Sequence, residues 1–374
     1  MSSSFFFAKS HLPAWYNAGN GFNEQNEGAA NMSEHLDIVC MGTALVDSII
    51  KGFDPEPVSA SGFTAASGSL NVGGEAVNEA VTASRLGMKA GIFCFLGMDP
   101  AGDMICNYLQ KNGADTSLIL REKDHPTPVT TMFVNEDGTR KSITNSSHRY
   151  NFHPEKHPEA FDGAKMMILG SLFRAPFNDP KIIHEVISHA AQNGTMIFAD
   201  TKLPNFVKLG LDDISDTLPL IDFITPNEDE AKYYTGKEDP EEMADVFLSY
   251  GIKNVVIKLG SKGCFFKNAQ MSLSLPAFPI DAVDATGAGD SFVAGLASEI
   301  LRMRETAGEG GAGNASAAAG GAEEAAGQVL LEKNKMEQAL RFASACGAIC
   351  TTAVGAGTAL QSREQVLAFL QKMD

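Results

Sequence analysis

The sequence predicts a three-layer α/β/α fold, in which helices cover both faces of a mostly parallel central sheet. First, from residue 36 onwards short runs that are apolar at consecutive positions alternate with longer amphipathic runs. Consecutive apolar positions are typical of strands buried on both faces, and strand–helix alternation indicates parallel connections. Second, 44% of the 374 residues are hydrophobic and 20% are charged, which allows a large core.

The predicted strands and helices follow in chain order. The predicted strands are residues 37–41, 90–96, 165–169, 195–199, 222–225 and 254–259. The predicted helices are residues 75–86, 103–111, 179–192, 228–234, 241–250, 290–304 and 335–351. Ligands of such sheets bind beyond the carboxyl ends of the strands, so polar residues at those ends are candidate site residues.

Three stretches depart from this alternation. Residues 48–72 and 127–146 have alternating, β-rich patterns, and the second contains a turn at 136–139, so they predict a small accessory sheet that acts as a lid. Residues 305–328 are rich in Gly and Ala and predict a flexible surface insertion. Residues 1–33 predict a disordered polar tail, which leaves a single domain at 34–374.

The charge balance and the cysteines limit the partners and the compartment. Lys and Arg total 29 against 46 Asp and Glu, a net charge of -17, which argues against nucleic acid or an anionic membrane as a partner. No apolar stretch reaches the roughly 18 residues of a membrane span. Six cysteines lie scattered, mostly in apolar runs, which predicts free thiols in the cytoplasm; Cys346 and Cys350 would share a helix face, but further zinc ligands are lacking.

The segment 278–296 carries the strongest chemical signal. An extended, proline-containing piece leads into Gly287, Ala288 and Gly289, and an apolar helical run begins at Asp290. Small residues let the backbone approach a ligand, and a helix N-terminus offers N–H groups, so the segment predicts an anion hole. Taken alone, Asp290 is better explained as an N-cap. The glycines lack the Lys-Ser/Thr of a P-loop and the early βαβ unit of a dinucleotide fingerprint.

Five runs of this sequence resemble the motifs of one family, in the family's order. The ribokinase-like (PfkB) carbohydrate kinases carry a C-terminal motif similar to Asp284-Ala-Thr-Gly-Ala-Gly-Asp-Ser-Phe292. Their other motifs are similar to Asn71-Val-Gly-Gly-Glu-Ala-Val-Asn-Glu-Ala80, Leu96-Gly-Met-Asp-Pro-Ala-Gly-Asp103, Thr225-Pro-Asn-Glu-Asp-Glu230 and Lys258-Leu-Gly-Ser-Lys-Gly263. The resemblance covers about residues 36–370 and leaves out the tail and the Gly/Ala insertion.

This resemblance implies an ATP-dependent phosphotransferase with an alcohol acceptor. It implies that Asp290 takes the proton of the substrate hydroxyl, and that the amides of Gly287, Ala288 and Gly289 hold charge on the γ-phosphate. The implied sugar-binding residues are Asp47, Gly73, Gly74 and Asn78. The implied ATP-binding residues are Asn227, Glu230, Lys258, Gly260 and Gly263, with Glu230 also holding Mg²⁺ through water.

Several residues keep alternative explanations. Asn227 and Glu230 alone would be a helix-capping pair, and Lys202 would either reach a phosphate or face solvent. Asp284 and Thr286, with the loop at 352–357, are candidate K⁺ ligands by resemblance. His148, Arg149 and Arg174 would either bind an anionic substrate group or face solvent.

The functional expectation is a sugar kinase that uses ATP and Mg²⁺ and forms a homodimer through its lid. The nearest alternative is a nucleoside kinase of the adenosine kinase type, which shares these motifs. A further alternative is a sugar- or nucleotide-binding protein that has lost catalysis, against which the intact Asp290 and Gly287–Gly289 run argue. The motifs leave open whether the substrate is a sugar, a sugar acid, a sugar phosphate or a nucleoside.

Overall fold

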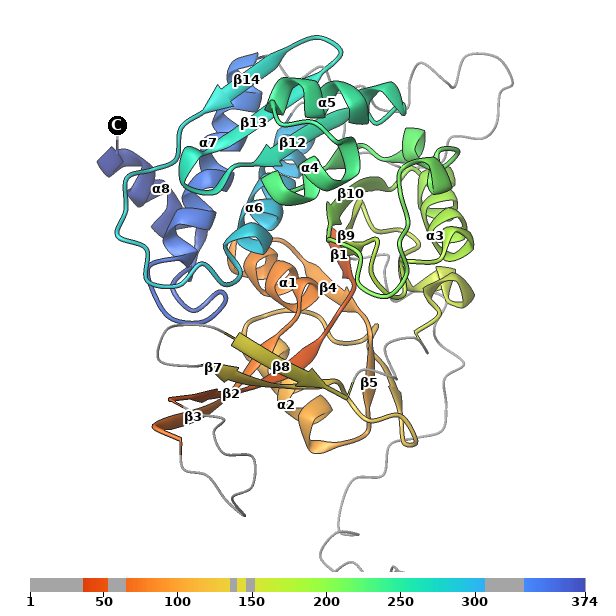
Figure 1. The fold of residues 1–374 in the computed structure, drawn as a ribbon, viewed down its shortest axis with the longest axis vertical. Helices are drawn as coiled ribbons and strands as arrows, with labels where there is room; N and C mark the ends of the chain where they lie inside the picture. The colour runs from red at the N-terminus through yellow and green to blue at the C-terminus, as the bar shows by residue number, and fades with distance from the viewer. Residues whose placement is uncertain (1–35, 53–64, 135–139, 146–151, 307–332, 374) are drawn as a thin grey trace, which may run out of the picture.

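A computed structural model describes residues 36–52, 65–134, 140–145, 152–306 and 333–373. Its centre is an eight-stranded sheet in the order β14-β13-β12-β11-β10-β9-β1-β4 (Figure 1). The strands are β1 (Ile38–Met41), β4 (Ala90–Phe93), β9 (Met166–Leu172), β10 (Met196–Thr201), β11 (Phe223–Ile224), β12 (Asn254–Lys258), β13 (Cys264–Asn268) and β14 (Ser272–Leu275). The pairs from β4 to β12 are parallel, and β12, β13 and β14 pair antiparallel.

Helices cover both faces of this sheet, so the predicted three layers are confirmed. In β1, Ile38 and Cys40 face one buried cluster and Val39 faces the other, because successive strand residues point to opposite faces. The first cluster includes α1 (Glu75–Arg85), α2 (Pro100–Lys111), α6 (Ala288–Thr306) and α7 (Lys333–Cys350). The second includes α3 (Pro180–Gln192), α4 (Glu228–Thr235) and α5 (Pro240–Ser249), while α8 (Arg363–Met373) packs on α7.

Three of these helices begin with the same Asp-Pro pair. Asp99, Asp179 and Asp239 are the N-caps of α2, α3 and α5, and each side chain accepts a backbone N–H of the first turn. Proline follows in each case, where its missing N–H costs nothing and its φ is already helical. These caps explain why α2 begins at Pro100, three residues before the predicted start.

A second sheet of four strands, in the order β3-β2-β7-β8, lies below the body in Figure 1. Its strands are β2 (Leu45–Lys51), β3 (Ser67–Gly73), β7 (Val129–Val134) and β8 (Arg140–Thr144). The predicted accessory sheet therefore exists, and β7 and β8 form the expected hairpin. Because β2 follows β1 closely and β3 leads directly into α1, this sheet is attached at the carboxyl edge of the central sheet.

The strand predicted at 90–96 was wrong as a single element. It divides into β4, which pairs with β1 in the central sheet, and β5 (Phe95–Gly97), which leaves that sheet and pairs with β6 (Leu120–Glu122). The antiparallel edge strands β13 and β14 and the helix α8 were not predicted. The remaining short elements are turns of 3₁₀ helix at Pro154–Lys156, Pro158–Ala160, Asp212–Ile214, Leu218–Leu220 and Gly260–Lys262.

Several predicted segments lie outside the described residues: the tail at 1–33, nearly all of the insertion at 305–328, the turn at 136–139 and residues 53–64 of the lid. Among the helices that the structure describes, none is both long and apolar enough to cross a membrane.

Candidate active site

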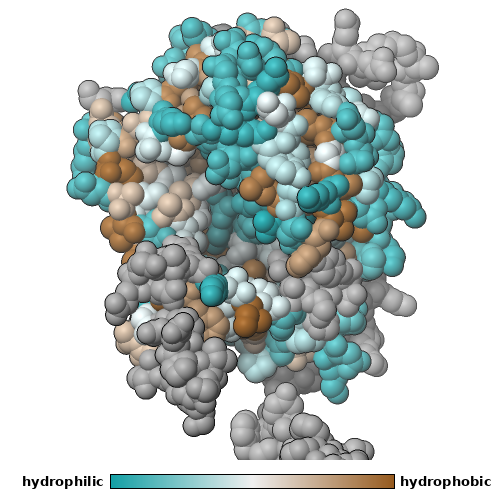
Figure 2. Space-filling view, in the orientation of Figure 1, coloured by the Kyte–Doolittle hydropathy of each residue, from teal (hydrophilic) through white to brown (hydrophobic). Residues whose placement is uncertain are grey.

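The first turns of α1 and α6 meet at the carboxyl edge of the central sheet, and their side chains form the centre of the site. The Asn78 amide in α1 donates a hydrogen bond to Asp290 Oδ2 in α6, with the two atoms 2.7 Å apart. One turn further along α1, the hydroxyls of Thr82 and Ser291 lie 3.4 Å apart. Figure 2 shows a hollow, lined by hydrophilic residues, between the body and the small sheet.

The glycines before α1 allow it to begin at this place. Gly74 has φ 108, which favours glycine, and a Cβ there would lie 2.2 Å from the carbonyl oxygen of Thr43. A Cβ at Gly73 would lie 2.7 Å from Asp47 Oδ2, so the carboxylate of Asp47 lies directly over this glycine. Burial, and then the charge of Glu75, raise the pKa of Asp47. Asp47 thus lies over the glycine pair that precedes α1; that Asp47, Gly73, Gly74 and Asn78 bind a sugar stays a prediction.

Asp290 is the third residue of α6, because the helix begins at Ala288 and not at Asp290 as predicted. Its side chain is 7% exposed and bonds Asn78, which differs from an N-cap contact. Burial raises the pKa of Asp290; the ammonium of Lys202 opposes this shift and the carboxylate of Glu75 adds to it. A raised pKa makes a carboxylate a better proton acceptor near neutral pH.

The run Gly287–Gly289 faces a lysine. Gly287 has φ 78, and a Cβ there would lie 2.6 Å from Ala356 Cβ, so the loop at 352–357 packs against this turn. A Cβ at Gly289 would lie 3.6 Å from Lys258 Nζ, which sets an ammonium beside the start of α6. The amide of Ala288 donates to the carbonyl of Ala285 at 3.2 Å, so this N–H is already engaged in a turn.

Asp200, at the end of β10, gathers cations around the centre. It is fully buried, and its Oδ1 accepts hydrogen bonds from Lys258 Nζ and from the hydroxyl of Thr225. Lys202 Nζ lies 3.6 Å from Asp200 Oδ2 and 3.9 Å from Glu75 Oε1. Burial by itself lowers the pKa of Lys202, but the surrounding carboxylates outweigh it and the net shift is upward. Lys202 is therefore held by carboxylates and is not a solvated lysine.

Asn227 and Glu230 form a capping box at the start of α4. Asn227 Oδ1 accepts the Glu230 amide, and Glu230 Oε2 accepts the Asn227 amide, each at 2.9 Å. Glu230 Oε2 also accepts the Thr201 hydroxyl at 3.0 Å. Burial, and then the charge of Asp200, raise the pKa of Glu230. The capping explanation from the sequence is thus confirmed, and the hydrogen bonds that the described residues give Glu230 all use Oε2, which leaves Oε1 available.

The predicted ATP-binding glycines flank a tight turn between β12 and β13. Gly260 has φ 59 and Gly263 has φ 104, and a Cβ at Gly263 would lie 1.9 Å from the Leu275 carbonyl. Lys262 in this turn pairs with Glu228 on the surface. The turn therefore borders the segment 274–279, which lines a cavity of 260 Å³ together with Glu337, Arg341, Ser344 and Met373.

Asp284 ties its motif to the loop at 352–357. Asp284 Oδ1 accepts the amide and the hydroxyl of Thr286, and Oδ2 accepts the Gly355 amide at 3.0 Å. These bonds position Asp284 and Thr286 together; that they bind K⁺ stays a prediction. Arg174 Nε donates to the Leu203 carbonyl, while His148 and Arg149 lie outside the described residues.

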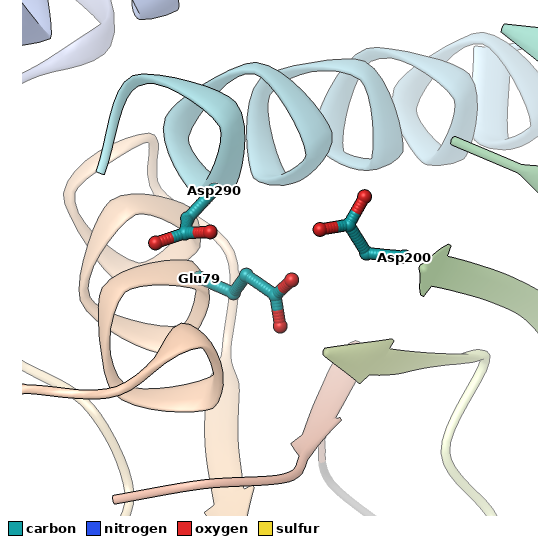
Figure 3. Close-up of side chains that lie close together, drawn as sticks. All are labelled: Glu79, Asp200 and Asp290. Carbon is teal, nitrogen blue, oxygen red and sulfur yellow. The ribbon is translucent and has the colours of Figure 1, made fainter. Parts of the chain in front are cut away.

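Glu79 was missed by the sequence reasoning. Its side chain, one residue after Asn78, is fully buried, and its carboxylate lies close to those of Asp200 and Asp290 (Figure 3). Burial, and then the charges of Asp290 and Asp200, raise the pKa of Glu79. The available signal was a carboxylate on the buried face of α1, whose neighbours Ala76 and Ala80 are apolar.

A buried carboxylate held by an amide, beside an ammonium and a glycine-rich helix start, is suited to moving a phosphoryl group onto an alcohol. The comparisons with known proteins agree with this class. A probable fructokinase-2 of Arabidopsis thaliana is 28% identical over 347 residues, which are 89% of this chain and 95% of that protein. A ribokinase of Haemophilus influenzae is 27% identical over 306 residues, covering 80% of this chain and 87% of that protein.

The fold is shared with solved ribokinases. The structure of Arabidopsis thaliana ribokinase complexed with ribose and ATP has a TM-score of 0.71 at 22% identity, over 90% of this chain and 99% of that one. The ribokinase of Giardia lamblia has a TM-score of 0.73 at 20% identity, over 91% of this chain and 100% of that one. Residues 36–363 match the pfkB family carbohydrate kinase. The chain belongs to this family, whose members are ATP-dependent phosphotransferases acting on carbohydrates.

Proposed function

We propose that this enzyme transfers the γ-phosphate of ATP to a hydroxyl of a sugar, with Asp290 as the general base. The observation that carries the proposal is the hydrogen bond from Asn78 to Asp290 Oδ2, with Lys258 facing Gly289 on the other side. The bond fixes one carboxylate oxygen and leaves Oδ1 to take the hydroxyl proton. Lys258 and the amides of Gly287 and Gly289 would offset the charge on the transferred group.

The acceptor sugar would lie between α1 and the small sheet. Asp47 over Gly73 supplies an acceptor for sugar hydroxyls, and the close approach permitted by Gly73 and Gly74 brings the sugar toward Asp290. The named relatives are fructokinases and ribokinases, which favours a sugar over a nucleoside. The acidic centre argues against an inactive binding protein, because such a protein has no need of a buried base.

ATP would extend from Gly289 past the turn at Gly260–Lys262 to the 260 Å³ cavity. In that cavity the guanidinium of Arg341 lies 5.7 Å from the ring centre of Phe278, and together they form a wall suited to a flat adenine ring. Mg²⁺ would be held through water by Glu230, whose Oε1 remains available beside Lys258 and Asp200. When bound, the ion offsets the charge of the phosphates.

A second copy of the chain is proposed to cover the small sheet. Leu70 and Ile143 are 61% and 70% exposed, and both belong to the register row that runs through Ser48 and Thr131. They therefore lie on one face, opposite the face that carries Asp47. An exposed apolar face of this kind favours a homodimer. Light scattering that gives the mass of one chain, 39.7 kDa, at micromolar concentration would exclude it.

We propose a cytoplasmic location from the free state of the cysteine thiols. All six cysteines are free, and five of them are buried. This pattern fits a reducing environment such as the cytoplasm.

The proposal is tested by ADP release, measured against sugars, sugar acids, sugar phosphates and nucleosides, with Asp290→Asn as the inactive control. We expect the wild-type chain to phosphorylate a neutral sugar and the Asp290→Asn variant to leave it unphosphorylated. A nucleoside as the best acceptor would replace the sugar assignment, and equal rates for wild type and variant would reject the general base.

A further inference from the structure

Among the residues that the structure describes, the buried carboxylate of Glu79 has no hydrogen-bond partner. It is 0% exposed, and neither Oε1 nor Oε2 has a hydrogen-bond partner among the described residues. Buried polar atoms are rarely left in this way, because desolvation of a charged group costs several kcal/mol unless something offsets it. Gly170 makes room for this side chain: a Cβ there would lie 2.8 Å from Glu79 Oε2.

Two further carboxylates converge on the same point. Glu79, Asp200 and Asp290 each offer an oxygen, and these atoms all lie within 4.8 Å of one another. Figure 3 shows the carboxylates of Glu79 and Asp200 directed toward each other, with that of Asp290 beside them. Asp200 Oδ2 is also buried without a hydrogen-bond partner among the described residues. Glu79 therefore faces Asp200 Oδ2, which has no hydrogen bond among the described residues and whose nearest cation is Lys202 Nζ at 3.6 Å.

The two neighbouring lysines offset only part of this negative charge. Lys258 donates to Asp200 Oδ1, the oxygen on the other side of that carboxylate. The Lys202 ammonium lies between two carboxylates, 3.6 Å from Asp200 Oδ2 and 3.9 Å from Glu75 Oε1. Glu75, Glu79, Asp200, Glu230 and Asp290 thus set five carboxyl groups against two ammonium groups. A buried excess of negative charge calls for a cation or for bound protons.

We propose that Glu79, Asp200 and Asp290 bind a divalent cation without the help of nucleotide, as a site separate from the Mg²⁺ that accompanies ATP. All three ligands are carboxylate oxygens, which suit hard ions such as Mg²⁺ or Mn²⁺. Each of the three oxygens lies within 4.8 Å of the other two, so small side-chain shifts would bring them to the separation of about 4.2 Å or less between two ligand oxygens of Mg²⁺. The Mg²⁺ that accompanies ATP is expected at a different carboxylate, that of Glu230. Its Oε2 accepts hydrogen bonds from Thr201 and Asn227, so Glu230 is held away from the three proposed ligands.

The ion would lie beside the carboxylate that receives the hydroxyl proton. There it would offset the charges of Glu79 and Asp200 beside the carboxylate of Asp290. The competing explanation is that Glu79 is a neutral acid, kept protonated by its buried site. The two explanations predict opposite results for metal binding.

The experiment is a titration of the nucleotide-free chain with Mn²⁺, in which free Mn²⁺ is followed by electron paramagnetic resonance. We expect about one bound ion per chain below millimolar concentration, and at least tenfold weaker binding in Glu79→Gln. The matched control is Glu228→Gln, which removes a carboxylate that pairs with Lys262 on the surface, and it should bind as the wild type does. Wild type without binding, or Glu79→Gln with unchanged binding, would overturn the site.

A second readout shows whether the variant is folded. Mn²⁺ should raise the melting temperature of the wild type, because a ligand that binds only the folded state stabilises it. Glu79→Gln should melt cooperatively and without this rise. A rise of equal size in the variant would assign the ion to surface carboxylates and reject the proposal. Neither readout uses turnover, so the outcome is independent of whether the chain phosphorylates a sugar.

Discussion

Asn78 and Asp290 are 212 positions apart in the sequence, yet the side-chain amide of one donates to the carboxylate of the other at 2.7 Å. The bond joins the first turns of α1 and α6, which carry the N-terminal and C-terminal motifs of the family. It fixes the orientation of Asp290 before any substrate arrives, and preorganisation of this kind is what positions a proton acceptor for catalysis. The bond therefore links the packing of two helices to the proposed chemistry.

Asp290→Asn should abolish turnover and leave the fold intact. The change removes a buried charge but keeps the shape of the side chain, so the melting temperature at neutral pH should hold or rise. The turnover number should fall by about 10²–10⁴-fold, because the proton acceptor is lost. Calorimetry should show retained ATP binding. A folded variant with ordinary turnover would reject Asp290 as the base.

Asn78→Ala tests the partner of that base. Without the amide, Asp290 loses its one oriented contact from α1, and turnover should fall by about tenfold or more. In the double variant with Asp290→Asn, the second change should add almost nothing, because both changes act on the same proton transfer. The measurement is a double-mutant cycle in turnover number. Independent, multiplying losses would mean that Asn78 acts on the sugar and not through Asp290.

The sequence was sufficient for the repeating parts of this fold and for residues within motifs. Buried parallel strands are a local pattern, and Gly74 and Gly287 have the positive φ values that favour glycine. Glu79 and Asp200 are different, because their importance arises only where α1, β10 and α6 converge. Nothing within either segment indicates that convergence. The division of 90–96 into β4 and β5 likewise depends on a distant partner, β6.

Gly263→Ala and Gly260→Ala form a matched pair in one turn. At Gly263, with φ 104, a new Cβ would lie 1.9 Å from the Leu275 carbonyl, so the turn must distort. At Gly260, with φ 59, nothing lies within 4 Å of a new Cβ. We expect Gly260→Ala to cost about 1 kcal/mol of unfolding free energy, the ordinary cost of a left-handed residue. Gly263→Ala should cost about 3 kcal/mol or more and weaken ATP binding. Equal losses in urea unfolding would show that the turn adapts freely.

Lys258→Met should weaken both the fold and ATP binding. It leaves the fully buried Asp200 without its closest cation, and breaking a buried ion pair costs about 3–5 kcal/mol; Lys202 nearby reduces this to about 2–3 kcal/mol. The added change Asp200→Asn should restore part of the stability, because the unpaired charge is gone. It should not restore ATP affinity, since the ammonium beside Gly289 is still missing. Full recovery of both properties would show that Lys258 serves the fold alone.

Glu79→Gln should change how stability depends on pH when a chelator removes divalent cations. Burial, followed by the charges of Asp290 and Asp200, raises the pKa of Glu79 in the folded chain, whereas an unfolded glutamate titrates near about 4.3. Between these two pKa values the folded state binds more protons than the unfolded state. Its stability is therefore greatest below the unfolded pKa and falls as pH rises toward the folded one.

The variant has no proton to lose at this position, so it should resist that fall. The wild type should lose up to about 1.4 kcal/mol of unfolding free energy per pH unit from this group, while Glu79→Gln loses less. Asp290 also has a raised pKa and is coupled to Glu79, so the comparison reports the titration of the two carboxyl groups as a pair. Urea unfolding between pH 5 and 8 should thus give a stability difference in favour of Glu79→Gln that grows with pH. A difference that stays constant over this range would show that Glu79 does not titrate there, and one that shrinks would show that its carboxylate is stabilised within the fold.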